Sequence, residues 1–205
     1  MVSTKVLGCI AGLVGLVLGA GTTVALLGPS QGELQQPSGA SAAQHSSAAP
    51  ISDADFARDA AEGGMAEVKL GQLANDKGHS ITVKDFGKRM VNDHNAAGNE
   101  LSSIATREKL SLPADLSKRD QALYNQLSKM TGTAFDRAYA RLMVRDHAND
   151  VSEFGTEASN GRDQNLKDFA QRTLPTLEEH LKLAREMLRT VSGASSASGQ
   201  SGLSR

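Results

Sequence analysis

The chain lacks the residues that several common kinds of protein depend on. It has one cysteine, Cys9, in 205 residues, so a disulfide framework and a thiolate metal site are excluded. Trp is absent and the formal net charge is −1, which leaves no basic field for nucleic acid. No Gly-x-Ser-x-Gly, phosphate-loop or zinc-protease motif occurs. We therefore expect a binding or structural protein rather than an enzyme, and no nucleic-acid partner.

The N-terminal segment has the character of a targeting or membrane sequence. One cation, Lys5, precedes the run Val6–Leu27, which is apolar or small except for two threonines. A run of roughly 20 such residues is long enough to cross a bilayer as an anchor. It also fits a signal peptide, with Thr23-Val24-Ala25 as the cleavage site. Both alternatives carry the rest of the chain out of the cytoplasm, and an uncleaved segment would make the membrane a partner.

Composition divides the chain into four parts. The segment after the apolar run is rich in Gly, Ser, Gln and Pro and cannot bury enough apolar surface to order itself. The C-terminal segment has the same Ser/Gly character. The sequence therefore predicts a signal peptide or membrane anchor (1–27), a disordered linker (28–52), a folded domain (53–191) and a disordered tail (192–205).

The central part has the composition and periodicity of helices. Ala, Leu and charged residues dominate it, and apolar residues recur at steps of three and four. Asp53 is the expected N-cap of the first helix, and Gly78 and Gly161 are expected to end helices. Pro175 predicts a kink, or else two short helices that meet at Thr173-Leu174. The predicted helices cover about 54–76, 81–109, 118–129, 134–159 and 164–190.

An internal repeat indicates how these helices pair. Five residues recur at one offset of 83 positions, and a turn glycine stands first in each set. Such a repeat predicts two helical hairpins, each with an apolar face that it cannot bury alone, joined by a crossover that contains a short helix. The expected fold is all-α, a ferritin-like four-helix bundle preceded by the N-terminal apolar helix. The repeated residues are Gly78, Lys84, Asp85, Phe86 and Arg89, matched by Gly161, Lys167, Asp168, Phe169 and Arg172.

Three histidines stand on or beside the apolar faces of three different predicted helices. They are His94, His147 and His180. If the turns at Gly78 and Gly161 lie at the same end of the bundle, His94 and His147 fall within one helical turn of each other in height. His180 then lies about one turn further from the turns.

Carboxylates near these histidines complete a candidate metal site. On the same count, Glu62 is level with His94, and Glu67 lies about one turn nearer the turn. Imidazole and carboxylate together suit iron, copper, zinc or manganese, and methionines 90 and 143 would add thioethers that favour copper. The alternative is a packed core in which the histidines hydrogen-bond to neighbouring groups. The candidate metal ligands are His94, His147, His180, Glu62, Glu67, Asp93 and Asp146.

Six segments between about 53 and 187 match a known family when taken together: Ala60–Val68, Val83–Phe86, Met90–His94, Phe135–Tyr139, Met143–His147 and Thr173–His180. They resemble a bacterial outer-membrane-protein family, number 4142 of the domains of unknown function, in the ferritin-like superfamily. The resemblance implies a ferritin-like bundle in the bacterial envelope and no established activity. Di-iron members of that superfamily carry Glu-x-x-His on two helices, whereas Val91 and Leu177 stand three residues before His94 and His180.

These observations lead to two expectations for function. The first is an envelope protein, exported to the periplasm or anchored in the inner membrane by residues 6–27, that serves as a binding, structural or stress-related domain. Its partner would be another protein or a second copy of the chain. The second is a metal-binding redox or metal-handling protein that uses the histidines. Convergence of the imidazoles and a carboxylate within a few ångströms favours the second.

Overall fold

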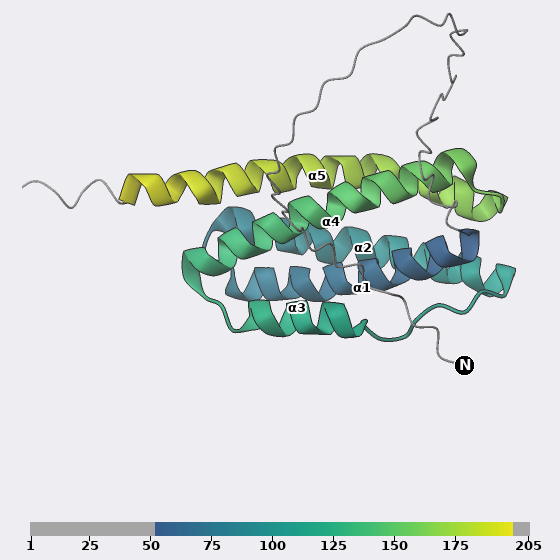
Figure 1. Ribbon diagram of the computed structural model, residues 1–205, viewed down its shortest axis with the longest axis horizontal. Helices are drawn as coiled ribbons and strands as arrows, with labels where there is room; N and C mark the ends of the chain where they lie inside the picture. The colour runs from purple at the N-terminus through teal and green to yellow at the C-terminus, as the bar shows by residue number, and fades with distance from the viewer. Residues whose placement is uncertain (1–51, 199–205) are drawn as a thin grey trace, which may run out of the picture. The chain divides into compact units, whose positions relative to one another are not determined.

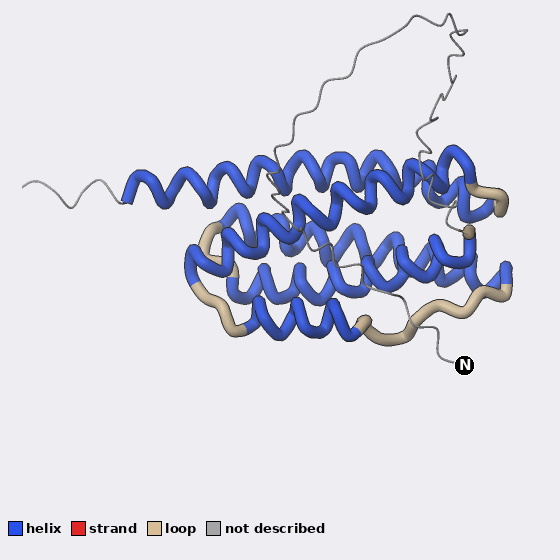
Figure 2. Tube along the Cα trace, in the orientation of Figure 1, coloured by secondary structure: helices blue, strands red, loops and turns tan. Residues whose placement is uncertain are grey.

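The computed structural model describes residues 52–198, and within that range the chain is all helical, without a strand (Figures 1 and 2). The expected all-α architecture is confirmed. The predicted N-terminal apolar segment and most of the linker lie outside the described residues. Among residues 52–198, no helix is both long enough and apolar enough to span a bilayer. The helices are α1 (Asp53–Lys77), α2 (Ile81–Glu108), α3 (Lys118–Ser128), α4 (Gly132–Asn160) and α5 (Gln164–Ser198).

The four long helices form two antiparallel hairpins that pack on each other. One hairpin is α1 with α2, and the other is α4 with α5 (Figure 1). The connection between them runs back along the bundle and includes α3, which contacts α1 and α4. As a result, α2 and α4 point in the same direction, and the turns at Gly78 and Gly161 lie at opposite ends of the bundle (Figure 1). The expectation that both turns lie at one end is wrong.

Each hairpin closes the turn of the other through a carboxylate. The Asp53 side chain accepts hydrogen bonds from the backbone N–H groups of Arg162–Asp163 at 3.1 and 2.8 Å. The Asp136 side chain accepts from those of His79–Ser80, both at 2.8 Å. Asp53 is therefore not the cap of its own helix, because Ser52 caps α1 by accepting from the N–H of residue 55. The two aspartates are 83 positions apart, and so are the two pairs of N–H groups. The sequence repeat therefore corresponds to an approximate two-fold symmetry between the hairpins.

Helix α5 is longer than expected and is not divided at Pro175. It runs through Pro175 without interruption, so the alternative of two short helices is wrong. It also continues to Ser198, beyond the expected end near Thr190. The remainder of the predicted tail lies outside the described residues.

The apolar core consists of two clusters that meet at the middle of the bundle. On α2, Met90 belongs to one cluster and Leu101 to the other. On α4, Met143 belongs to the first and Phe154 to the second. Each of these helices therefore contributes to both apolar clusters, and the residues midway along it lie between the two clusters.

Two glycines let α1 and α2 approach closely beside this midpoint. A Cβ atom added to Gly71 would lie 2.7 Å from the carbonyl oxygen of Gly87 and 2.9 Å from Cβ of Met90. A Cβ added to Gly87 would lie 2.6 Å from the carbonyl oxygen of Gly71. These glycines are required by backbone contact, since any side chain at either position would force the helices apart.

Candidate metal centre

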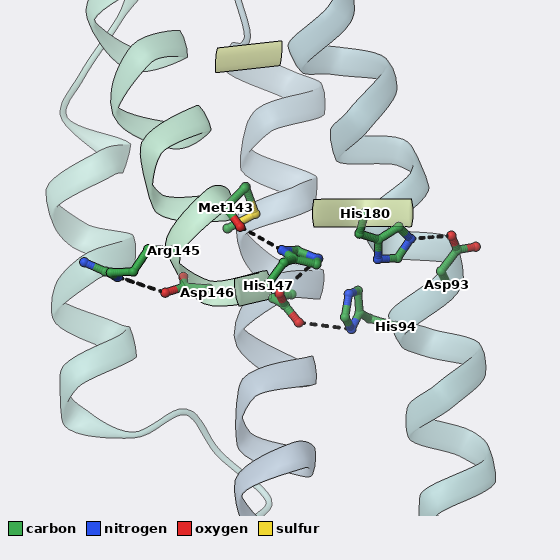
Figure 3. Close-up of polar contacts among 8 residues, drawn as sticks. Asp93, His94, Met143, Arg145, Asp146, His147 and His180 are labelled. Carbon is green, nitrogen blue, oxygen red and sulfur yellow. Dashed lines mark hydrogen bonds and ion pairs between the residues drawn. The ribbon is translucent and has the colours of Figure 1, made fainter. Parts of the chain in front are cut away.

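Each of the four long helices places one ionisable side chain at the midpoint between the apolar clusters. Glu67 comes from α1, His94 from α2, His147 from α4 and His180 from α5. Their exposed fractions are 5%, 8%, 0% and 1%. In Figure 3 the three imidazole rings face one another. Their ring centroids are 5.2 to 5.7 Å apart.

Two of the histidines are each held by an oxygen on the outer side of the ring. Nδ1 of His147 lies 3.0 Å from the carbonyl oxygen of Met143, one turn earlier on α4. Nε2 of His180 lies 2.8 Å from Oδ2 of Asp93 on α2. Both oxygens accept, so these nitrogens carry the ring protons. The opposite nitrogens, Nε2 of His147 and Nδ1 of His180, then carry lone pairs.

The third histidine completes a set of three free ring nitrogens. Nδ1 of His94 lies 3.1 Å from Oε2 of Glu67, which leaves its Nε2 free. The free nitrogens of His94, His147 and His180 are buried and have no hydrogen-bond partner. The three histidines can each offer one nitrogen such that all three lie within 4.8 Å of one another. Ligands about 2.0–2.1 Å from one metal ion lie within about 4.2 Å of each other, which is close to that spacing.

Burial keeps these imidazoles neutral at physiological pH. Burial lowers the pKa of His94 well below its usual range, and the neighbouring His147 and His180 lower it further. Burial and the proximity of His180 lower the pKa of His147 to about 4. Burial also lowers the pKa of His180, although the hydrogen bond to Asp93 opposes this effect. Neutral imidazole is the form that binds a metal.

Glu67 brings a buried carboxyl group to the same level of the bundle. Its Oε1 atom lies 3.4 Å from Nε2 of His147 but has no hydrogen-bond partner. Burial, followed by the charges of Asp150 and Asp146, raises the pKa of Glu67 well above its usual range. A carboxylate in such a place is stable when a cation compensates its charge. These buried histidine and glutamate groups can hold a metal ion.

The remaining predicted ligands take other positions. Asp93 stands behind His180 and orients its ring. Asp146 points away from the rings and pairs with Arg145 at 3.1 Å (Figure 3). Glu62 lines a cleft on the same side of the bundle as Asp146. The structure therefore does not bring Glu62 or Asp146 to the histidines.

The sequence count put Glu62 rather than Glu67 level with the histidines, because it used backbone heights alone and assumed both turns at one end. With the turns at opposite ends, Asp53 marks the Gly161 end. Glu67 lies 14 residues after Asp53, and His147 lies 14 residues before Gly161. Helical side chains also lean toward the N-terminus of their own helix. Because α1 and α2 are antiparallel, this lean brings Glu67 and His94 together. It also moves the His180 ring toward the Gly161 turn, to the level of the other rings.

One residue of the site has no counterpart in the sequence prediction. Asp150 on α4 can place a carboxylate oxygen within 4.8 Å of ligand atoms of Glu67 and His147. Burial and the charges of Asp146 and Glu153 raise its pKa to about 7. Asp150 follows Glu67 by 83 positions, so the repeat offset is the signal that would have found it.

The donor set does not fit the di-iron centre of ferritin-like proteins. Such centres take a Glu from each of two helices and a Glu-x-x-His pair from each of the other two. Val91, Val144 and Leu177 stand three residues before the histidines, so none of them belongs to such a pair. Imidazole and carboxylate groups are nevertheless ligands that suit a transition-metal ion.

Fold and site together define a helical bundle with a buried histidine and glutamate centre that can hold a metal ion. The chain belongs to the family called Domain of unknown function (DUF4142), which it matches over residues 36–187. The resemblance to this family is thereby confirmed. No curated protein matches the sequence.

Two solved structures are similar to this chain. A DUF305 fragment from Deinococcus radiodurans has a TM-score of 0.60 and 14% identity, with 70% of this chain and 98% of that chain covered. A predicted secreted DUF305 protein from Streptomyces coelicolor has a TM-score of 0.59 and 15% identity, with 70% and 96% covered. At such low identity the similarity shows a shared fold.

Proposed function

We propose that this protein binds one transition-metal ion between His94, His147 and His180, with Glu67 as the carboxylate ligand, and that it handles or carries that metal. One observation carries the proposal: three buried ring nitrogens without partners face a common point. A buried polar atom without a partner costs about 1–3 kcal/mol. Three such atoms side by side are explained by an ion that binds them all.

A packed polar core explains the histidines less well. Structural histidines in a core are stabilised when both ring nitrogens have partners. Here each ring has one nitrogen next to an oxygen and the other without a hydrogen-bond partner. Metal-bound imidazoles have the same arrangement, in which one nitrogen binds the metal and an oxygen next to the other nitrogen fixes the orientation of the ring. The oxygens of Glu67, Asp93 and Met143 serve in that way for the three rings.

The surroundings of the centre favour a metal that exchanges or reacts over one that is sealed in. A cavity of about 460 Å³ reaches Glu67 and His94 from the α1–α2 side. Gly63 and Gly64 line it, and a Cβ atom at Gly63 would meet nothing within 4 Å. Open space beside three or four protein ligands is typical of sites that admit water or a further ligand.

Metal analysis of the purified protein tests this proposal. The protein is incubated with zinc, copper, iron or manganese in turn, dialysed and analysed for bound metal. The wild type should retain one ion, and His94→Ala and His147→Ala should lose it. His79→Ala is the matched control, because His79 is exposed in the α1–α2 turn, and it should bind as the wild type does. Equal metal content in all four proteins would refute the ligand assignment.

We further propose that this ferritin-like bundle works outside the cytoplasm, in the bacterial envelope. The apolar segment 6–27 supports export, and so does the similarity of the fold to a predicted secreted protein. Expression of the full chain and of a variant without residues 1–27, followed by cell fractionation, tests this. Equal distribution of both between the fractions would contradict export by that segment.

A further inference from the structure

A cleft lined by carboxylates leads to the histidine centre from the side of α3. It has a volume of about 340 Å³ and lies between α1, α3 and α4. Seven carboxylates line it, whereas Arg119 is the one cation among its lining residues, and we call it the acidic cleft. Its carboxylates are those of Asp59, Glu62, Glu67, Asp120, Asp146, Asp150 and Glu153.

The floor of the acidic cleft belongs to the buried centre. Glu67 lines the cleft and is only 5% exposed, and its Oε1 atom has no hydrogen-bond partner. Nε2 of His147, from a side chain that is fully buried, lies 3.4 Å from that atom. Oδ2 of Asp150 is also buried, and the Asp150 and Glu67 carboxyl groups interact with each other. Three buried ligand atoms therefore meet where the cleft ends.

These atoms form a second group with metal-binding spacing. Glu67, His147 and Asp150 can place their ligand atoms within 4.8 Å of one another, as the three histidines can. His147 belongs to both groups. Since its Nδ1 is held by the Met143 carbonyl, Nε2 is the nitrogen available to either group, and one lone pair binds one ion at a time. The two positions therefore cannot both use His147 simultaneously.

We infer that Glu67, His147 and Asp150 form a capture position for a divalent cation, which arrives through the acidic cleft and passes from there to the three-histidine centre. This inference rests on the proposed function. In the transfer, Nε2 of His147 stays bound while the Asp150 oxygen leaves and the free nitrogens of His94 and His180 bind. The ion changes ligands without a change in oxidation state.

Electrostatics supports this direction of travel. Seven carboxylates and one guanidinium line the acidic cleft. Such an excess of carboxylates draws cations to the cleft and speeds their association. The cavity of about 460 Å³ shares four of these carboxylates, those of Asp59, Glu67, Asp150 and Glu153, and adds none of its own, so the acidic cleft has the larger number.

Cobalt(II) uptake by the full chain tests the inference, with the visible absorption of the bound ion as the signal. Asp150→Asn should slow association about ten-fold, and it should slow dissociation by a similar factor, because a capture position lies on the path in both directions. Asp76→Asn is the matched control, since Asp76 is exposed at the end of α1 outside the cleft. It should keep the wild-type rates. Asp150→Asn removes one of several repelling carboxyl groups, so the variant should fold.

The outcomes separate this inference from the function on which it rests. An unchanged association rate in Asp150→Asn overturns the capture position, and faster dissociation overturns it as well, because Asp150 would then be a ligand of the final ion. His180→Ala should retain weak cobalt binding that the double variant His180→Ala/Asp150→Asn loses. Wild-type affinity in His180→Ala refutes the three-histidine centre alone. A wild-type chain that binds no cobalt refutes both.

Discussion

Asp93 and His180 are joined by a 2.8 Å hydrogen bond from Nε2 of the imidazole to Oδ2 of the carboxylate. Asp93 directly precedes His94 on α2, whereas His180 lies on α5. Helix α2 thus supplies one histidine of the centre and holds the ring of another. The ring nitrogen that faces the centre is determined by this bond, because it fixes the proton on the opposite side of the ring.

Replacement of Asp93 should weaken metal binding without abolishing it. Asp93→Ala releases the His180 ring and its preferred tautomer, and such loss of an orienting group reduces metal affinity about 10–100-fold. Isothermal titration with zinc measures the change. Asp85→Ala removes an exposed carboxylate from the same helix and should bind zinc as the wild type does. A Kd for Asp93→Ala within two-fold of that control would show that the hydrogen bond has no role in binding.

Met90 and Met143 should prove to be core residues and not metal ligands. Both are fully buried in the apolar cluster on one side of the centre. Leu has a similar volume, so Met90→Leu and Met143→Leu should each change the free energy of unfolding by less than about 1.5 kcal/mol. Metal stoichiometry should be unchanged, since the Met143 carbonyl that holds His147 belongs to the backbone. Loss of copper binding in either variant would identify a thioether ligand instead.

Two glycines of the first hairpin should respond in opposite directions to the same substitution. Gly71→Ala places a Cβ against the Gly87 carbonyl oxygen and should destabilise the fold by about 1–3 kcal/mol or more. Gly98→Ala meets nothing within 4 Å on an exposed helical face. It should stabilise the fold by about 0.5–1 kcal/mol, because Gly loses more conformational freedom than Ala in a helix. Urea denaturation of both variants checks the sign of each change.

Stability should decline as pH rises through neutrality, in part through Glu157. This side chain is 4% exposed, and burial followed by the charges of Asp53 and Asp163 raises its pKa to about 7. The folded state thus holds a proton that the unfolded state releases above pH 4.5, so the stabilisation is complete below pH 4.5 and is lost as pH rises through about 7.

Thermal unfolding between pH 5 and 8 measures this effect. Glu157→Gln should show a smaller loss of melting temperature over that range than the wild type. Glu178→Gln is the matched control, since Glu178 is exposed on α5, and it should follow the wild-type curve. Parallel curves for all three proteins would mean that Glu157 does not contribute.

The fold could be predicted largely because its signals are local. Periodic apolar positions marked the helices, and Ser80 and Ser117 cap α2 and α3. The 83-residue offset paired the helices into hairpins. The relative direction of the hairpins could not be read in this way, because the same repeat is compatible with turns at one end or at opposite ends. Whether the turns lie at one end or at opposite ends depends on whether the crossover runs the length of the bundle.

The candidate site was predictable in its histidines and less so in its carboxylates. A histidine on the apolar face of a helix points into the core, so the convergence of His94, His147 and His180 could be inferred from the sequence. A glutamate near a helix edge can face a cleft or the core, and a count of backbone heights alone favoured Glu62 over Glu67. Asp150 was missed because its position follows from the symmetry between hairpins rather than from its neighbours in sequence.

Each hairpin supplies the carboxylate that closes the turn of the other, so two copies of a single hairpin could build much of this bundle. Asp53 and Asp136 are equivalent under the repeat, and so are Glu67 and Asp150. Duplication of a single hairpin therefore accounts for both closed ends and for a carboxylate from each half at the middle. It does not account for the imidazoles, whose equivalents in the other half carry no ligand. The equivalents of His94, His147 and His180 are Leu177, Gly64 and Ala97.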